Sequence, residues 1–584
     1  MKNLNLDWHE LKTNNKSISI IEYIEQNEDL YKRKYFEQIE KIGYYKLTKD
    51  KNIFQECQYK LTYNLWQMSS IMEKSFFKTP KIFEHIKLIA LLDIINSKKP
   101  DQVNIVGCNV ETAGLLTSLK KSTTFKFENI INDSKATCIY KSIKKNLRFE
   151  ALLWLSNQFF KKIKSPRIRK KRKQENSIFI MDYFVHLNFI KNKPSFYSSN
   201  IWEPLLKKLP KNHSIYFLHH FIPTKKIKSI SKAAKKVNDF NLHKNQFHNF
   251  LDLNLNLIIF FKAFFNFILF QLKTKKIISS LKKETLNEHN SIKFKFLKNF
   301  FKKSLTGKEL MQNILYIELF DDFFKKIEHQ KTGIYLQENQ GWEFAFINAW
   351  KKYRHGKLFA FNSASISNWD LRYLYPFDNK KISLIKQKLP DKFLVGSKHY
   401  KKLYTKYGYK KNNVLEVEAL RYLKHSKKLD KLPKGKILIM GSITKSENAF
   451  MIDTIRPLFL KLNQYKWYFK SHPASTYIIN DKNIKLITTD LNEIAKGLDF
   501  VICPSDSSVA IDCYFLRLNF LILLKKGVPN TSPLKNIDGI KFAYNTNDIT
   551  KLILTKHQKS IKEDFFSLDQ NLKNWNLILQ ENQI

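Results

Sequence analysis

Three short apolar runs in the last third of the chain each stop at a cluster of small, polar or basic residues. The runs at 437–440, 467–470 and 499–503 are followed by Gly-Ser, Ser-His-Pro and Pro-Ser-Asp-Ser-Ser. Patterns with the helical period separate these runs. The alternation predicts βαβ units in a parallel sheet. Ligands of such sheets bind outside the carboxyl ends of the strands, where all three clusters fall.

A similar rhythm of strands and helices occupies the middle of the chain. The strands expected upstream of the three runs lie at 103–107, 177–181, 214–218, 333–337, 358–361, 393–396 and 414–417. Residues 424–435 are polar, contain Pro433 and follow neither period, so they are the expected interdomain linker.

The pattern therefore predicts an α/β protein with two Rossmann-like domains facing a cleft, in which the ligand binds. We expect a helical N-terminal region at 1–100. An α/β domain with a helical insertion at about 160–330 follows at 101–425, and a second α/β domain spans 426–584.

The most apolar segment of the chain, residues 249–270, repeats its apolar positions every three or four residues. Asp252, Lys262 and three asparagines interrupt it, which argues against a transmembrane helix. Two alternatives stay open: the helix packs on a domain core, or it lies in a membrane interface. The basic cluster at 161–173 is likewise either an exposed linker or a contact with anionic lipid.

The formal net charge of +50 raises the question of a polyanionic partner. Only ten of the 102 basic residues are arginine, the residue type that makes bidentate contacts to bases, and the lysines are spread over every segment. We therefore expect a solvated basic surface and no nucleic-acid partner.

The five cysteines form no CxxC pair, which favours a reducing compartment without structural zinc. With no apolar signal region at the start, we expect a cytoplasmic protein.

The three polar clusters contain the residues expected to bind a nucleotide phosphate. The turn after the third run offers hydroxyls and the start of a helix, and helix N-termini bind anions. Lys470 and His472 would add a charge and an N–H donor from the neighbouring strand. The glycine after the first run lets a ligand approach the backbone. The expected site residues are Gly441, Ser442, Lys470, His472, Ser505, Ser507 and Ser508. The serines of the turn after the third run have a simpler alternative role, as caps of the following helix.

The first domain would supply the acceptor side of the site. Transfer onto a hydroxyl requires a base within hydrogen-bond reach. Glu338, directly after a predicted strand, is the first candidate, and Glu343, one turn into the next helix, is the second. Glu338 can instead simply cap the helix that starts at Trp342. The sequence shows no P-loop, GxSxG, HExxH or strand-flanked DxD motif, so we expect no metal.

Several longer motifs resemble a family of bacterial surface-carbohydrate (O-antigen type) glycosyltransferases. They lie at 65–74, 86–91, 337–343, 369–373 and 417–422 and include Trp-Asp-Leu-Arg and Glu-Ala-Leu-Arg-Tyr. In addition, His472-Pro473 and Ser507-Ser508 resemble motifs of bacterial sialyltransferases and of teichoic-acid glycerophosphotransferases.

The resemblance implies a GT-B fold and metal-independent transfer from a nucleotide-sugar donor, with CMP- or CDP-linked donors favoured. It also implies that His472, Ser507 and Ser508 hold the donor. The acceptor would be a surface polysaccharide or a lipid-linked glycan, reached by peripheral contact with the inner membrane. Two other functions remain open from the sequence: transfer of a polyol phosphate from a CDP-linked donor, and non-catalytic binding in glycan assembly.

Overall fold

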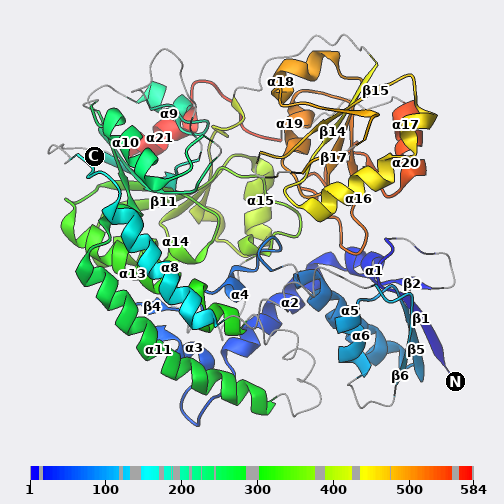
Figure 1. Ribbon diagram of the computed structural model, residues 1–584, viewed down its shortest axis with the longest axis horizontal. Coiled ribbons are helices and arrows are strands. Elements are labelled where there is room, and N and C mark those ends of the chain that lie inside the picture. The colour runs from blue at the N-terminus through cyan, green and yellow to red at the C-terminus, as the bar shows by residue number, and fades with distance from the viewer. Residues whose placement is uncertain are drawn as a thin grey trace.

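In a computed structural model, the chain folds into three parallel sheets with flanking helices (Figure 1). The structure describes residues 2–581 except 12, 14–16, 80, 118–122, 132–145, 170–176, 186, 188–196, 210–213, 225, 243–244, 285–300, 375–388, 424–434, 474, 476, 480 and 556–564. The expected linker at 424–435 and Lys170–Lys173 of the basic cluster thus lie almost wholly outside the described residues. Two sheets have the Rossmann-like pattern, which confirms the predicted α/β fold of two such domains.

The C-terminal sheet has six parallel strands in the order β16-β15-β14-β17-β18-β19. The strands are β14 (Lys436–Met440), β15 (Lys466–Lys470), β16 (Ile484–Leu486), β17 (Phe500–Pro504), β18 (Phe520–Leu523) and β19 (Phe542–Ala543). The helices are α16 (Lys445–Ile455), α17 (Leu458–Lys461), α18 (Leu491–Ile494), α19 (Val509–Phe515) and α20 (Thr546–Leu554). Every residue of β17 and β18 is buried, as expected for strands covered on both faces. The strand order reverses between β14 and β17, which creates a crevice there.

The central sheet has seven parallel strands in the order β13-β12-β11-β10-β7-β8-β9. The strands are β7 (Ser177–Tyr183), β8 (Ser214–His220), β9 (Gln246–Phe250), β10 (Thr332–Leu336), β11 (Lys357–Asn362), β12 (Lys392–Val395) and β13 (Val414–Glu416). Its helices include α9 (Glu203–Lys208), α10 (Ile230–Phe240), α13 (Lys308–Lys326), α14 (Gly341–Lys352) and α15 (Lys398–Lys406). The order reverses between β7 and β10, so the turn after β10 lies at the second crevice.

The N-terminal region is not purely helical, contrary to the prediction. Its strands β1 (Asn3–Asp7), β2 (Ile18–Ser19), β5 (Gln102–Val106) and β6 (Thr124–Glu128) form a separate parallel sheet. Its helices are α1 (Ile20–Gln26), α2 (Glu28–Gly43), α3 (Ile53–Glu56), α4 (Ser70–Glu73), α5 (Ile82–Lys98) and α6 (Val110–Thr117), and a short hairpin joins β3 (Gln58–Tyr59) to β4 (Tyr63–Asn64). The strand at 102–106 therefore belongs with β1, and not with the central sheet as expected. Alternation in β1 buries Leu4 and Leu6 on one face, which stabilises this pairing.

The helical insertion is shorter than the predicted range of about 160–330. Strands β7 to β9 and helices α9 and α10 fall inside that range and belong to the central sheet. What remains apart from the sheet is a layer of long helices, α8 (Leu147–Ile163) and α11 (Leu257–Glu284), packed on α13. The apolar stretch at 249–270 is likewise divided, because β9 ends at Phe250 and α11 begins at Leu257.

The end of the chain leaves the C-terminal sheet and returns to the central one (Figure 1). Helix α21 (Lys573–Glu581) carries Trp575, whose ring meets Phe361 of β11 edge-on with centroids 4.9 Å apart. The Trp575 indole N–H donates to the backbone oxygen of Glu418 at 2.9 Å. The last segment of the second domain predicted at 426–584, helix α21, therefore packs on the central domain.

Candidate functional site

A pocket of about 240 Å³ opens at the crevice of the C-terminal sheet. The turns after β14, β15 and β17 line it, so the three strand ends singled out in the sequence meet at one place. The lining residues are Arg421, Met440, Gly441, Lys470, Ser471, His472, Pro473, Asp490, Leu491, Asn492, Ser507, Ser508, Val509 and Asp512. Ligand pockets commonly enclose about 300–1,000 Å³, so a nucleotide-sized ligand would extend beyond this space.

Gly441 lines the pocket and also allows two turns to approach each other. A Cβ at this position would lie 2.9 Å from Cζ of Phe469 and 3.2 Å from the backbone nitrogen of His472. The Gly441 N–H donates to the carbonyl of Lys470 at 2.8 Å. The glycine therefore fixes the distance between the β14 and β15 turns, a packing role beyond the predicted close approach of a ligand.

His472 and Lys470 both line the pocket, but their side chains differ in what they can offer a ligand. Burial lowers the pKa of His472 below its usual value, so at neutral pH its imidazole is uncharged and donates through one ring nitrogen. The Lys470 ammonium donates to the backbone oxygens of Thr488 at 3.2 Å and Thr489 at 2.7 Å. It fixes the neighbouring loop while adding positive charge nearby.

Ser507 and Ser508 form the turn that leads from β17 into α19. The Ser507 hydroxyl accepts from the Val509 N–H at 3.2 Å, and Ser508 is the N-cap residue without a side-chain capping bond. Both residues are partly exposed to the pocket. The predicted capping role therefore applies to Ser507, and the Ser508 hydroxyl forms no such bond.

Ser442 and Ser505 do not line the pocket, although they were predicted beside it. Both are buried, and their hydroxyls donate to the Glu447 carboxylate at 2.9 and 3.3 Å. The Ser442 hydroxyl also lies 3.4 Å from Asp506 Oδ1. Burial, and then the charge of Glu447, raises the pKa of Asp506 well above its usual range, as expected for two carboxyl groups that share a proton. This buried network joins the turns after β14 and β17 to α16.

Sequence reasoning missed five polar residues of the lining, one of them Ser471 beside His472. Arg421 comes from the segment after β13, so the central domain contributes a guanidinium to the pocket. Asp490 is the N-cap of α18 and Asn492 lies in the first turn of that helix, while Asp512 lies one turn into α19. Arg421 lies within the motif at 417–422 noted in the sequence. Its position at the pocket depends on how the two domains pack, which local pattern does not encode.

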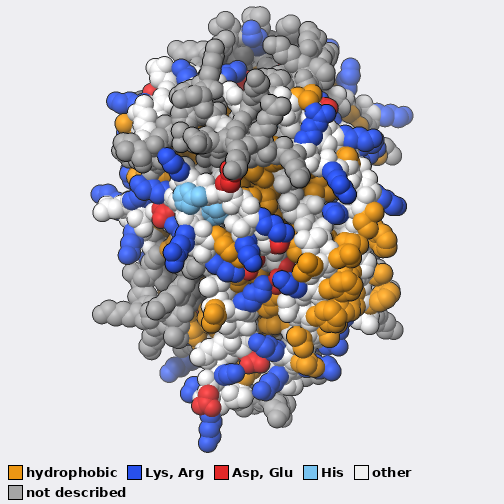
Figure 2. All heavy atoms as spheres, turned by 90° about the vertical axis from the view of Figure 1, so that its left-hand side faces the viewer, with side chains coloured by type: hydrophobic (Ala, Val, Ile, Leu, Met, Phe, Trp, Pro, Cys, Tyr) orange, Lys and Arg blue, Asp and Glu red, His pale blue; other side chains and the backbone are white. Residues whose placement is uncertain are grey.

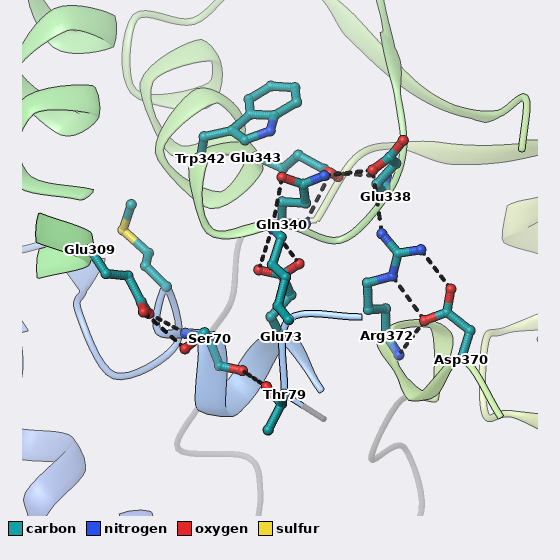
Figure 3. Close-up of polar contacts among 12 residues, drawn as sticks. Ser70, Glu73, Thr79, Glu309, Glu338, Gln340, Trp342, Glu343, Asp370 and Arg372 are labelled. Atoms are coloured by element: carbon teal, nitrogen blue, oxygen red, sulfur yellow. Dashed lines mark hydrogen bonds and ion pairs between the residues drawn. The ribbon is translucent and has the colours of Figure 1, made fainter. Parts of the chain in front are cut away.

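The predicted base Glu338 lies at the crevice of the central sheet and does not line the described pocket. Figure 3 shows Arg372 between Glu338 and Asp370. Arg372 lies 3.3 Å from Glu338 Oε2 and pairs with both oxygens of Asp370 at 2.8 and 2.6 Å. Gln340 donates to the same Glu338 oxygen at 2.5 Å. The Glu338 side chain keeps 31% of its area exposed, so it retains access to solvent while its orientation is fixed.

Glu343, the second candidate base, is buried and caps helix α14. Its Oε1 accepts from the N–H groups of Glu338 at 2.9 Å and Gln340 at 3.0 Å, which is one half of a capping box. Burial raises the pKa of Glu343 to about 8. With 1% of its surface exposed, Glu343 contacts neither solvent nor the pocket in this conformation.

Residues of the N-terminal region cover the turn that carries these glutamates. The Lys78 ammonium donates to Gln340 Oε1 at 3.2 Å, and a Cβ at Gly341 would lie 2.4 Å from the Met68 carbonyl oxygen. Figure 3 shows Glu73, from α4, directly beside Gln340. The segment 68–78 thus packs against the edge where the acceptor was expected.

A second polar cluster lies at the ends of β7 and β8, and sequence reasoning missed it. His219 Nδ1 pairs with Asp182, and His219 Nε2 lies 3.0 Å from His248 Nδ1. Trp202 donates its indole N–H to the same aspartate at 2.9 Å. All four side chains are buried, so the cluster stabilises the sheet in this conformation. The strand-end rule applied at Glu338 would also have pointed to Asp182 and His219.

No group of three or more His, Cys, Asp or Glu side chains in the described part of the chain is arranged to hold a metal ion. No protein-family profile matches the chain, and no curated protein sequence matches it.

Solved structures resemble the chain only distantly. One is UDP-N-acetylglucosamine 2-epimerase from Rickettsia bellii, 9% identical, with 70% of this chain and 94% of that chain covered and a TM-score of 0.36. A glycosyltransferase from Rickettsia africae is 11% identical, with 70% of this chain and 99% of that chain covered and a TM-score of 0.36. MurG from Acinetobacter baumannii is 10% identical, with 70% of this chain and 99% of that chain covered and a TM-score of 0.32. These similarities are too low to inform function, which is argued below from the residues of this chain.

Proposed function

We propose that the protein is a glycosyltransferase that moves a sugar from a nucleotide-activated donor onto a surface-polysaccharide or lipid-linked glycan acceptor in the cytoplasm. The donor would bind in the pocket of the C-terminal sheet, and the central domain would present the acceptor. A CMP- or CDP-linked donor is favoured because of the resemblance of the His-Pro and Ser-Ser motifs.

The observation that carries the proposal is the convergence of three polar strand ends on one pocket at the reversal of strand order. Gly441, His472 and the Ser507–Ser508 turn come from three neighbouring strands of a Rossmann-like sheet. Nucleotide phosphates bind at this position in such sheets. Arg421 adds a group suited to bidentate phosphate contacts.

The lining residues provide chemistry for each part of a nucleotide sugar. His472 and the serine hydroxyls can donate to phosphate oxygens, and Arg421 can balance their charge. The carboxylates of Asp490 and Asp512 can accept from sugar or ribose hydroxyls. Donors preorganised around the phosphate would stabilise the negative charge that develops on the leaving group. Glu338 is the proposed base for the acceptor hydroxyl.

A panel of CMP-, CDP-, UDP- and GDP-linked donors tests the proposal, with nucleotide release measured in the presence of a membrane-glycan extract. We expect one nucleotide class to be released, and His472→Ala to reduce its binding at least about tenfold, because a hydrogen bond to a charged group contributes about 1.5–3 kcal/mol. His329→Ala, an exposed histidine outside the pocket, is the matched control. Release should persist in excess EDTA, since the proposal includes no metal.

Three results would contradict the proposal. Release only from CDP-linked polyols would indicate a phosphotransferase. Absence of any nucleotide binding would indicate a non-catalytic binding protein. Full turnover by the folded His472→Ala variant would remove the donor-site assignment.

A further inference from the structure

The outer faces of helices α8 and α11 carry a concentration of exposed apolar side chains. Figure 2 shows hydrophobic side chains gathered in one patch on this side of the molecule, with lysines and arginines around it. On α11 the apolar side chains repeat every three or four residues. The exposed apolar residues of both helices each keep more than 40% of their surface accessible. They are Phe149, Leu153, Phe160 and Ile163 on α8, and Leu257, Ile258, Phe261, Phe265, Ile268, Leu269 and Leu272 on α11.

The two helices lie side by side and antiparallel, so their exposed residues form a single surface, here called the α8–α11 face. The rings of Phe159 and Phe260 lie 5.1 Å apart, and Arg148 donates to Gln271 at 2.9 Å. The first contact joins the end of α8 to the start of α11, and the second joins the start of α8 to the middle of α11. Monomeric soluble proteins rarely expose an extended apolar patch unless it binds something.

Helix α11 lies flat on the protein instead of projecting from it. It is long and apolar enough to cross a membrane by length and composition, yet 33% of its most apolar window is buried in the protein. Helix α11 packs on α13, its side chains Ile259, Ala263 and Phe267 are buried, and Asn266 donates to Glu318 of α13 at 3.3 Å. The Thr274 hydroxyl also donates to the Leu305 carbonyl at 2.9 Å. A helix held on one side in this way can present its other side to a membrane surface but cannot span the bilayer.

Basic residues stand at both ends of the α8–α11 face. Lys161 and Lys164 are exposed at the end of α8, and Lys275 and Lys276 are exposed beyond the apolar stripe of α11. From Leu257 to Lys283, α11 contains no acidic residue. An apolar face with lysines at its margins matches an anionic lipid surface, where acyl chains receive the apolar groups and head groups meet the ammonium groups.

We propose that the α8–α11 face binds the protein to an anionic lipid surface. A second copy of the chain fits less well, because a two-fold contact between identical faces brings lysines together in a protein of net charge +50. The proposal concerns this face alone and does not depend on the identity of the nucleotide.

Flotation with lipid vesicles tests the proposal on the full chain. Wild-type protein should float with vesicles of two-thirds phosphatidylcholine and one-third phosphatidylglycerol, and much less with phosphatidylcholine alone. The combined change Phe261→Ser, Phe265→Ser and Leu269→Ser should weaken partitioning by about tenfold or more, since each side chain loses several buried CH₂ equivalents. The matched control changes three exposed apolar residues of the C-terminal domain, Leu460→Ser, Ile478→Ser and Leu554→Ser, and should float like wild type.

Either of two results would overturn the inference. The first is equal flotation of the wild type and the α8–α11 variant, or no flotation of either. The second is a wild-type dimer in light scattering that the α8–α11 variant converts to a monomer, which would identify a second copy as the occupant. Thermal stability of each variant, measured alongside, separates loss of binding from loss of folding.

Discussion

At the scale of single residues, three side chains of the pocket lining could carry positive charge, and their surroundings differ. Lys470 already donates to two carbonyl groups, and burial disfavours a charge on His472. Arg421, delivered by the central domain, is therefore the side chain best suited to balance a diphosphate. In the proposed function, a contact from Arg421 of the central domain to the donor would also couple donor binding to the packing of the two domains.

Replacing Arg421 by Ala should weaken binding of nucleoside diphosphates by about tenfold or more, while leaving the weak binding of the free nucleoside unchanged. Arg421→Lys should recover part of the affinity, because it keeps the charge but loses the bidentate geometry. Calorimetric titration measures both ligands. Arg456→Ala is the control, since Arg456 is ion-paired with Asp453 outside the pocket lining. Equal loss of nucleoside and diphosphate binding would point to a damaged fold and contradict the assigned role.

The sequence predicted which strand ends form the pocket but not which side chains of each turn face it. Ser507 and Ser508 lie at the pocket, whereas Ser442 and Ser505 turn inward to Glu447. The direction of a side chain in a turn depends on local backbone dihedrals. The buried Glu447 carboxylate that accepts from both serines lies five residues from Ser442 but 58 residues from Ser505.

At the scale of elements, helix α14 shows how a candidate catalytic group can be a helix cap. The spacing of Gln340 and Glu343 fits a capping box, and that pattern is visible in the sequence. The burial of Glu343 is not visible there, because the covering segment 68–78 comes from far away in the chain. Burial leaves Glu343 with a pKa of about 8.

This pKa predicts a pH dependence of stability. Because the pKa of Glu343 is above the ordinary value of 4.5, the folded protein binds more protons than the unfolded chain between these values. The contribution of Glu343 to the free energy of unfolding is therefore present below pH 4.5 and lost as the pH rises to 8, by up to about 5 kcal/mol. Glu343→Gln retains the capping oxygen and does not titrate, so its melting temperature should fall less than that of the wild type between pH 5 and 8.5. Exposed Glu328→Gln should behave like wild type, and an unchanged slope in Glu343→Gln would refute the explanation.

At the scale of the whole molecule, the two Rossmann-like domains were predictable because each strand is a short apolar run with a clear end. The N-terminal sheet was not, because β1 pairs with β5 nearly one hundred residues away. The return of α21 to the central sheet escaped prediction for the same reason: nothing near Trp575 indicates that its partners are Phe361 and Glu418. Long-range pairing depends on complementary surfaces, and the local spacing of apolar residues along the sequence does not show which surfaces are complementary.

Binding of the donor nucleotide in the pocket between the β14, β15 and β17 turns is tested most directly by a crystal structure of the chain soaked with the nucleotide that raises the melting temperature most. The proposed donor site predicts phosphate groups within hydrogen-bond distance of His472 and the Ser507–Ser508 turn, with Arg421 on the same phosphates. Nucleotide bound elsewhere on the chain, with this pocket empty at saturating concentration, would contradict it.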